Sequence, residues 1–368
     1  MSVSEAKPRP LLHGIQAVRG VFAVLVVCHH VGVHSARYWK HDWLGGVFNQ
    51  STFRVDFFFV LSGFVLWAAH RADAGRPATT RNFLLRRGWR LYPLLISMTL
   101  FKVLLLACFP ARSSDSYQTI PSLLALPQTS FPVIVAAWTL SFEMFFMIIL
   151  AACLAMPGKA ALPALVLVAI LLAVGGVLFD VRPAIHGLGF ITHPVILEFA
   201  AGAVAAECVG QRGSRVWGML LCALAIVGLV IGSTQQLWFT SIAVIWQKSY
   251  WAVVFAVGFG GLALWERSCR PERWWLQDRW QLGRASYSIF LSHGFGFMVG
   301  FAVVKPEMVG GDPFWTNAFL LLLVVLSVLF GLGVYKYWER PLLNFCKSLT
   351  ACFPPRRTSS NPQQTPQA

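Results

Sequence analysis

Long uninterrupted apolar stretches dominate the pattern of hydrophobic and polar positions along this chain. Ten of these stretches reach the length of about 17–25 residues that a helix needs to cross a bilayer. In chain order they cover 15–34, 53–70, 91–109, 133–156, 161–179, 189–208, 216–233, 240–264, 285–304 and 314–337. The pattern predicts an all-α fold, a polytopic membrane helix bundle of about ten transmembrane helices.

Composition supports this interpretation. The chain is 57% hydrophobic and only 12% charged, whereas a soluble domain carries about 25% charged residues. The net charge of +15 could by itself indicate a nucleic-acid partner. The distribution of the basic residues along the chain distinguishes a nucleic-acid-binding surface from a membrane topology.

The basic residues alternate strongly between successive loops. If the N-terminus is cytoplasmic, the inner loops hold 21 of the 30 Lys and Arg residues and the outer loops hold 5. This is the positive-inside bias of membrane proteins. It predicts a multi-pass protein with both termini cytoplasmic, and it leaves no reason to expect nucleic-acid binding.

The same pattern predicts the domain organisation. Residues 1–14 form a cytoplasmic segment, 15–343 form the transmembrane domain, and 344–368 form a cytoplasmic tail that we expect to be disordered. The tail is rich in Pro, Ser, Thr and Gln from Phe353 onward. Because the outer loops are short, any chemistry must occur within the bundle.

The first span carries ionisable residues at membrane depth, where such groups are usually paired or functional. Arg19 and His30 are eleven residues apart, so they share one helix face at a separation of roughly 16 Å along the axis. His30 is a candidate general base, because imidazole titrates near neutral pH. The alternatives are a buried structural histidine, or a metal pair with His34, which lacks a second ligand pair elsewhere.

Three acidic residues inside later spans are candidates for a role in the site. Asp56 begins the second span on the same side as His30, and it either orients His30 or stabilises a helix N-terminus. Glu143 lies in the fourth span, where a carboxylate must be paired or protonated. It is either an acid/base partner or a member of a structural ion pair with one of the intramembrane cations. Glu198 poses the same choice, and we expect a structural role.

Polar groups elsewhere complete the candidate site. Arg86, Arg87 and Arg90 precede the third span, where they either grip phosphate groups or anchor the inner membrane surface. Ser286 and His293 are two turns apart on one helix face, with Tyr287 alongside. These residues, together with Trp138, either line a channel or join helices by hydrogen bonds.

Taken together, these residues resemble acyltransferase family 3, the integral-membrane acyltransferases that O-acetylate sugars and related molecules. The motifs are IQAVRGVFAVLVVCHH, VDFFFVLSGF, R-x-x-R before LYP, AWTLSFE, GRASYSIFLSH and WERPL. They occur in the family's order from about residue 14 to 343. Gln16 stands where the family pattern places an acid.

The resemblance implies a donor and an acceptor. Acetyl-CoA or another acyl-CoA would bind on the cytoplasmic side through Arg86, Arg87 and Arg90, and no metal is expected. The acceptor would be a hydroxyl of a carbohydrate or glycoconjugate, and the protein would lie in the cell inner (plasma) membrane. The catalytic residues would be His30, Arg19, Glu143 and Asp56, with Trp138, Ser286, Tyr287 and His293 along a substrate tunnel.

The ten spans and the intramembrane charges leave one alternative of another class. A transporter or flippase for a glycan or a small metabolite would share both features. Such transporters are commonly built from internal repeats, and the two halves of this chain share no motif. The sequence does not determine the oligomeric state.

Overall fold

The computed structural model describes residues 13–48, 53–108, 118–209, 213–234, 243–269, 281–309 and 312–351. Within these ranges the chain forms helices, turns and connecting segments, with no β-strand. Ten of its helical stretches are long and apolar enough to cross a membrane. The predicted all-α bundle of ten spans is therefore confirmed, and the chain is a multi-pass membrane protein.

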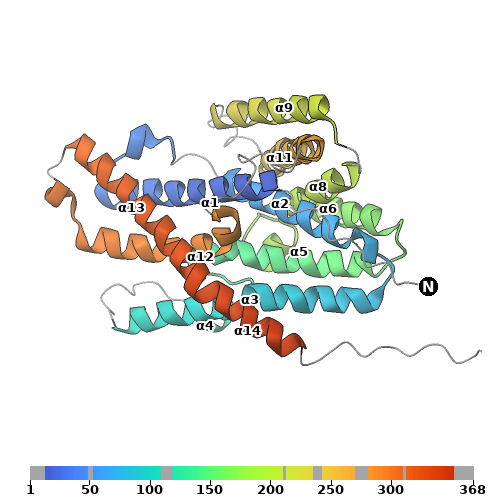
Figure 1. Cartoon of the computed structure of the whole chain (residues 1–368), viewed down its shortest axis with the longest axis horizontal. Helices are drawn as coiled ribbons and strands as arrows, with labels where there is room; N and C mark the ends of the chain where they lie inside the picture. Colours follow the sequence, from blue (N-terminus) through green and yellow to red (C-terminus); the bar gives the residue numbers. More distant parts are fainter. Residues whose placement is uncertain are drawn as a thin grey trace, which may run out of the picture.

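The helices follow one another along the chain with short connections (Figure 1). They are α1 (His13–His34), α2 (Phe53–His70), α3 (Pro77–Cys108), α4 (Thr119–Leu123), α5 (Trp138–Leu154), α6 (Ala161–Leu178), α7 (Gly187–Ile191), α8 (Ile196–Cys208), α9 (Arg215–Thr234), α11 (Val244–Ser268), α12 (Leu282–Val303), α13 (Pro313–Val334) and α14 (Arg340–Ala351). One-turn π-helices at Ser35–Trp39 and Tyr335–Glu339 extend α1 and join α13 to α14.

Two spans differ in shape from the predicted ones. The basic stretch before residue 91, expected as a linker, is the first part of α3, which continues through Pro93 as one helix. The sixth span is interrupted between α7 and α8. Pro194 lies in this break, and a proline inside a helix removes a backbone donor and clashes with the preceding turn.

The end of the chain also differs from the prediction. Residues 344–351, expected to begin a disordered tail, are helical and belong to α14. Residues 352–368 lie outside the described part of the chain. The α13–α14 helix crosses the bundle diagonally, and α14 lies against α3 (Figure 1).

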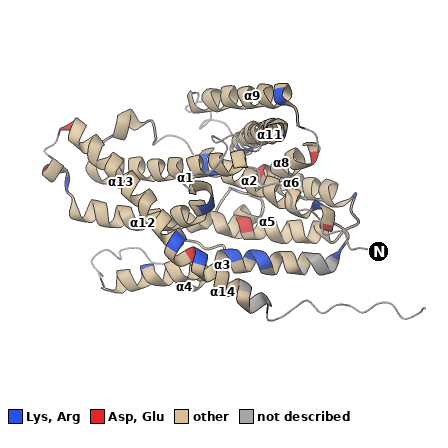
Figure 2. Ribbon diagram, viewed as in Figure 1, with Lys and Arg blue, Asp and Glu red and all other residues tan. Residues whose placement is uncertain are grey.

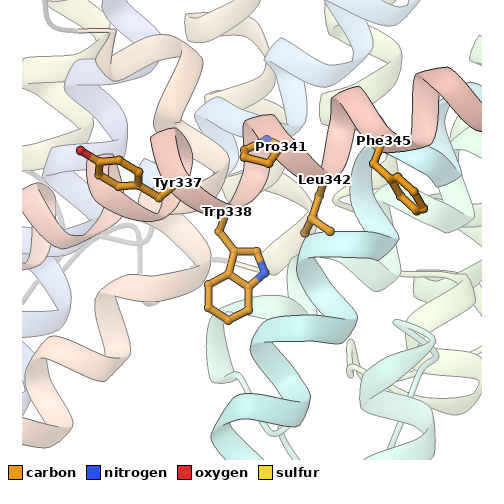
Figure 3. A pocket seen from close by; sticks show the side chains of 5 residues that line it. All are labelled: Tyr337, Trp338, Pro341, Leu342 and Phe345. Atoms are coloured by element: carbon orange, nitrogen blue, oxygen red, sulfur yellow. The ribbon is translucent and has the colours of Figure 1, made fainter.

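The outer surface of this last helix is apolar. Tyr337, Trp338, Pro341, Leu342 and Phe345 line a shallow groove along it (Figure 3). The helix is strongly amphipathic, as is typical of helices that lie at the boundary between lipid tails and headgroups.

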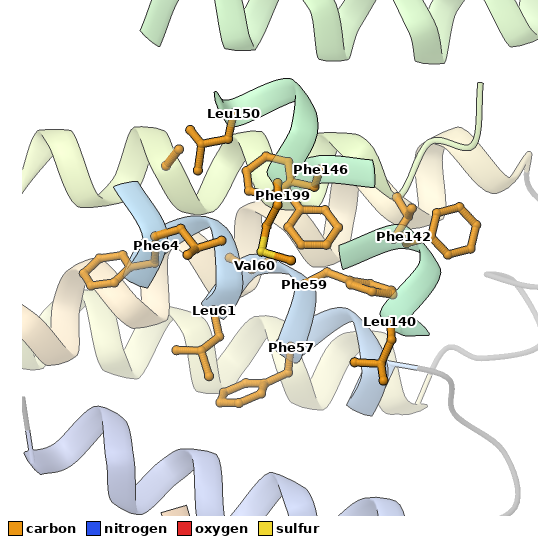
Figure 4. Packing of buried hydrophobic residues seen from close by; sticks show 14 of the residues in the cluster. Phe57, Phe59, Val60, Leu61, Phe64, Leu140, Phe142, Phe146, Leu150 and Phe199 are labelled. Atoms are coloured by element: carbon orange, nitrogen blue, oxygen red, sulfur yellow. The ribbon is translucent and has the colours of Figure 1, made fainter. Parts of the chain in front are cut away.

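Close contact between α2 and α8 organises one half of the bundle. A Cβ atom on Gly63 would lie 1.9 Å from the carbonyl oxygen of Phe199, and one on Gly202 would lie 2.0 Å from that of Val60. Glycine at both positions lets the two backbones touch, as small residues do in membrane helix pairs. Aromatic rings fill the surrounding space, and Phe146 of α5 stacks on Phe199 at a centroid distance of 4.2 Å (Figure 4).

A second close contact places α1 against α12. A Cβ atom on Gly20 would lie 2.8 Å from the backbone nitrogen of Gly283. The start of α1 is held by Glu266 of α11, whose carboxylate accepts hydrogen bonds from the backbone N–H groups of His13 and Gly14. These are donors that a helix leaves free at its N-terminus. The register of α1 against α12 is thereby set where both helices carry candidate site residues.

Candidate active site

Charged residues from distant parts of the sequence lie on helices in the middle of the bundle (Figure 2). Arg19 of α1 is within electrostatic range of four of them, namely Arg87, Arg90, Glu143 and Glu339. We call these five residues the arginine cluster. It unites the first, third, fourth and last spans.

The arginines of this cluster have no carboxylate at contact distance. Among the described residues, no salt bridge within 4.0 Å joins Arg19, Arg87 or Arg90 to an acid. The Nε atom of Arg19 is buried without a hydrogen-bond acceptor. Three guanidinium groups against two carboxylates leave a net positive charge. The cluster is therefore suited to bind an anionic group, and guanidinium matches phosphate geometry well.

Arg86 does not belong to this cluster. Its side chain is exposed, and its Nε donates to the backbone carbonyl of Asn82 on the same helix, at 3.2 Å. Unlike Arg87 and Arg90, Arg86 is not among the charged groups within electrostatic range of Arg19. The prediction that Arg86 binds the donor beside Arg87 and Arg90 is not supported by its position.

Glu339 is a member of the cluster that the sequence analysis did not place there. It is 3% exposed, and its carboxylate accepts a hydrogen bond from the hydroxyl of Ser288 on α12. It also lies within electrostatic range of Arg19 and Arg90. Its position within the terminal WERPL motif, at the end of the last apolar span, was the available signal, since a buried acid needs a partner.

Tyr287 lies between α12 and α3. Its hydroxyl donates to the backbone carbonyl of Leu91, at 2.8 Å, and its ring is buried within electrostatic range of Glu143 and Glu339. The hydroxyl proton is thus already engaged. Tyr287 joins two helices beside the arginine cluster and is not a free donor for a reacting group.

A second group of polar side chains lies further along α1. The rings of His30 and His293 are 4.9 Å apart between centroids, and His29 lies 5.4 Å from His30 on its other side. His34 packs on Phe297 of α12, with centroids 5.6 Å apart. We call His29, His30, His34 and His293 the histidine cluster.

Three of these four imidazoles are fixed by backbone carbonyl groups. The Nδ1 atoms of His29, His34 and His293 lie 2.7, 2.8 and 3.2 Å from the carbonyl oxygens of Phe48, His30 and Ile289. A carbonyl oxygen only accepts, so each of these Nδ1 atoms must carry a proton. His30 makes no hydrogen bond to any described residue through its ring. Of the four, it is the one whose ring nitrogens are free for chemistry.

The groups within electrostatic range of His30 are three histidines and Arg54, with no carboxylate among them in the described structure. Arg54 is buried, and its guanidinium lies 5.0 Å from the ring centroid of Phe53. The sequence pattern alone did not indicate Arg54 as a site residue. A buried cation beside an imidazole is placed to stabilise negative charge near that ring.

Asp56, predicted either to orient His30 or to stabilise a helix end, has another partner. Its carboxylate forms an ion pair with Lys248 of α11, and Lys248 lies 3.6 Å from Glu198 of α8. Both carboxyl groups are fully buried. Asp56 lies on the face of α2 that packs against α8 and α11, so the predicted contact with His30 is not formed. Glu198, expected to be structural, lies in this ion-pair triad.

The remaining candidates have less direct positions. Trp138 begins α5, and its ring packs on Phe59 and Phe142 at centroid distances of 6.2 and 5.8 Å. Ser286 is buried, with no hydrogen bond from its hydroxyl in the described structure. No group of three or more His, Cys, Asp or Glu side chains in the described ranges is arranged to hold a metal ion.

Comparison with known proteins identifies the family. The family model described as acyltransferase domain matches residues 12–337, which is most of the chain. The chain belongs to this acyltransferase family. It is 31% identical over 301 residues to the exopolysaccharide production protein ExoZ of Rhizobium meliloti (strain 1021), covering 78% of this chain and 88% of that protein. No solved structure matches the chain.

The two clusters of this acyltransferase lie on one face of α1, roughly 16 Å apart along the helix axis. Side chains on a helix lean toward its N-terminus, so Arg19 extends away from His30. The two residues therefore cannot contact the same small reacting group. The predicted pair is better described as two sites joined by one helix.

Proposed function

We propose that this acyltransferase transfers an acetyl or other short acyl group from acyl-CoA to a hydroxyl group of a polysaccharide. The observation that carries the proposal is the arrangement of the arginine cluster and His30 on one face of α1. The arginine cluster can bind an anionic group, and the imidazole of His30 lies at a different depth of the bundle. This separation fits a donor molecule that has a charged head and a long arm ending in a thioester.

The donor would bind through its phosphates. Acyl-CoA carries a diphosphate and a further phosphate, and Arg19, Arg87 and Arg90 provide three guanidinium groups without direct carboxylate partners. The positive-inside charge pattern supports binding from the cytoplasm. The thioester arm would then extend along α1 toward His30.

At the histidine cluster, His30 would act as general base. It takes the proton of the acceptor hydroxyl while the hydroxyl oxygen bonds to the thioester carbonyl carbon. When the carbon–sulfur bond breaks, the coenzyme A thiolate leaves and recovers that proton from His30. Arg54 would stabilise the oxyanion of the tetrahedral intermediate. General-base catalysis of this kind contributes about 10²–10⁴-fold.

The polysaccharide acceptor is suggested by the relative, whose name connects it with exopolysaccharide production. Mass spectrometry of surface polysaccharide from strains with and without the gene tests both acyl group and acceptor. We expect acyl esters that disappear with the gene. Unchanged polysaccharide in the deletion strain contradicts the proposed acceptor class.

Two neighbouring arginines give a matched test of the donor site. Arg87→Gln should raise the KM for acetyl-CoA about 10-fold or more, because a charge-assisted hydrogen bond contributes about 1.5–3 kcal/mol. Arg86→Gln should leave the KM unchanged, since Arg86 is exposed and bonded to its own helix. Initial rates of labelled acetyl transfer in membranes measure both constants. Equal effects of the two substitutions contradict this donor site.

A further inference from the structure

A general-base histidine usually needs a partner that fixes its orientation and stabilises its protonated form, most often a carboxylate. His30 has no such acid among the described residues within its electrostatic range. Two buried acids elsewhere in the bundle have other partners, with Asp56 paired to Lys248 and Glu339 bonded to Ser288. The residue that faces His30 across the helix contact is His293.

The surroundings of His293 determine which of its nitrogens is available. Its Nδ1 lies 3.2 Å from the carbonyl oxygen of Ile289, so Nδ1 is the donor, and Nε2 of the neutral ring keeps its lone pair. The ring is 3% exposed and lies between Phe290 and Phe297, at centroid distances of 6.1 and 5.2 Å. Both the orientation of the ring and its tautomer are fixed by the protein.

The distance between the two rings suits a direct interaction. The two rings are neighbours, with centroids 4.9 Å apart and planes tilted by 43°. The contact of Gly20 with Gly283 holds α1 and α12 close enough for this approach. His293 keeps a lone pair on Nε2, and the adjacent ring of His30 makes no hydrogen bond to a described residue.

We propose that His293 is the positioning residue of the acyl-transfer step and that, when the ring of His30 turns its N–H toward it, Nε2 of His293 accepts a hydrogen bond from His30. His293 thereby orients the imidazole of His30, which is the role of the carboxylate in a Ser-His-Asp triad. This hydrogen bond keeps the other nitrogen of His30 unprotonated and directed at the acceptor hydroxyl. It strengthens when His30 takes up the proton, and His293 itself gains and loses none. The inference rests on the proposed role of His30 as base.

Two isosteric substitutions separate this role from a structural one. In His293→Asn, the amide nitrogen replaces Nδ1 and keeps the bond to Ile289, while the acceptor at the Nε2 position is lost. In His293→Gln, an amide oxygen replaces Nε2 and supplies an acceptor. We expect the Asn variant to lower kcat about 10- to 100-fold with an unchanged KM for acetyl-CoA, and the Gln variant to recover most of the activity. If His293 has only a structural role through its bond to Ile289, the Asn variant should retain more activity than the Gln variant.

A second measurement does not depend on acyl transfer. Diethyl pyrocarbonate modifies unprotonated imidazole, and mass spectrometry of the full-length protein in membranes gives its rate at His30. We expect slower modification of His30 in His293→Asn, and near-normal rates in His293→Gln and in the control His29→Asn, which keeps the bond to Phe48. Equal rates in the wild type and His293→Asn overturn the inference. If the wild type transfers no acyl group, the proposed function fails, while the labelling result still decides the contact.

Discussion

The ion-pair triad of Lys248, Asp56 and Glu198 offers the sharpest test of how the bundle is held together. It joins α2, α8 and α11 through one ammonium group and two fully buried carboxyl groups. Lys248→Met removes the ammonium group and keeps the length of the side chain. The two carboxyl groups then face each other in an apolar interior without a cation.

The cost of this change follows from the charges. With all groups ionised, the wild-type triad carries one uncompensated negative charge, and the variant carries two. The additional charge must be neutralised by a proton, and protonating a carboxyl of ordinary pKa at pH 7 costs about 4 kcal/mol. Loss of one partner from a buried ion pair costs about 3–5 kcal/mol in other proteins. A decrease of roughly 10 °C in melting temperature is expected for a chain of this size.

The variant should also gain a characteristic pH dependence. Its folded form holds a proton that the unfolded chain lacks at neutral pH, so its stability rises as the pH falls. Between about pH 7 and pH 5 the recovery should be about 1.4 kcal/mol per unit for each carboxyl neutralised. The exposed Lys305 supplies the control, because Lys305→Met leaves no buried charge.

Melting curves of purified variants in detergent, followed by fluorescence-detected gel filtration, measure these effects. Asp56→Asn and Glu198→Gln should each be mild, because each leaves one carboxylate for Lys248. The triple variant lacking all three charges should recover most of the stability lost in Lys248→Met. If Asp56→Asn abolishes acyl transfer at unchanged stability while Lys248→Met is harmless, Asp56 acts on the chemistry and the structural role is wrong.

Two further predictions concern helix packing. Gly63→Val should prevent correct packing of α2 on α8, because its Cβ would lie 1.9 Å from the Phe199 carbonyl oxygen. Gly175→Val should be tolerated, because a Cβ there would meet nothing within 4 Å. The yield of monodisperse protein after gel filtration distinguishes the two variants, and equal yields contradict the close contact. Tyr287→Phe should cost about 1 kcal/mol of stability through the lost bond to Leu91 and leave kcat nearly unchanged; a 100-fold loss of kcat would instead make its hydroxyl a catalytic donor.

The sequence predicted the number and type of helices well, because apolar length and loop charge are local properties. It predicted the shared face of Arg19 and His30 for the same reason, since helix periodicity fixes both positions. It was wrong about the break at Pro194 and about the start of the tail. There the outcome depends on how a weakly apolar segment such as α14 packs against α3, and that information is not local.

The acids show most clearly where sequence reasoning ends. Asp56, Glu143, Glu198 and Glu339 look alike in sequence, as single carboxylates in apolar runs. Asp56 and Glu198 share Lys248, which lies in α11 nearly two hundred residues after Asp56, while Glu143 and Glu339 lie near the arginines. Which cation each acid meets depends on the three-dimensional order of the helices, which the sequence pattern does not specify.

The place of Glu339 links the end of the chain to the donor site. Glu339 ends the one-turn π-helix between α13 and α14, and π-helical turns of this kind frequently occur at functional sites. A wider turn changes the direction of the side chains that follow it, and here the Glu339 carboxylate is directed at Ser288 and the arginine cluster. The last helix therefore contributes a charge that keeps three arginines from repelling one another when no anion is bound. Because Glu339 makes no direct salt bridge with them, the arginines keep their hydrogen-bond donors available for the proposed donor phosphates.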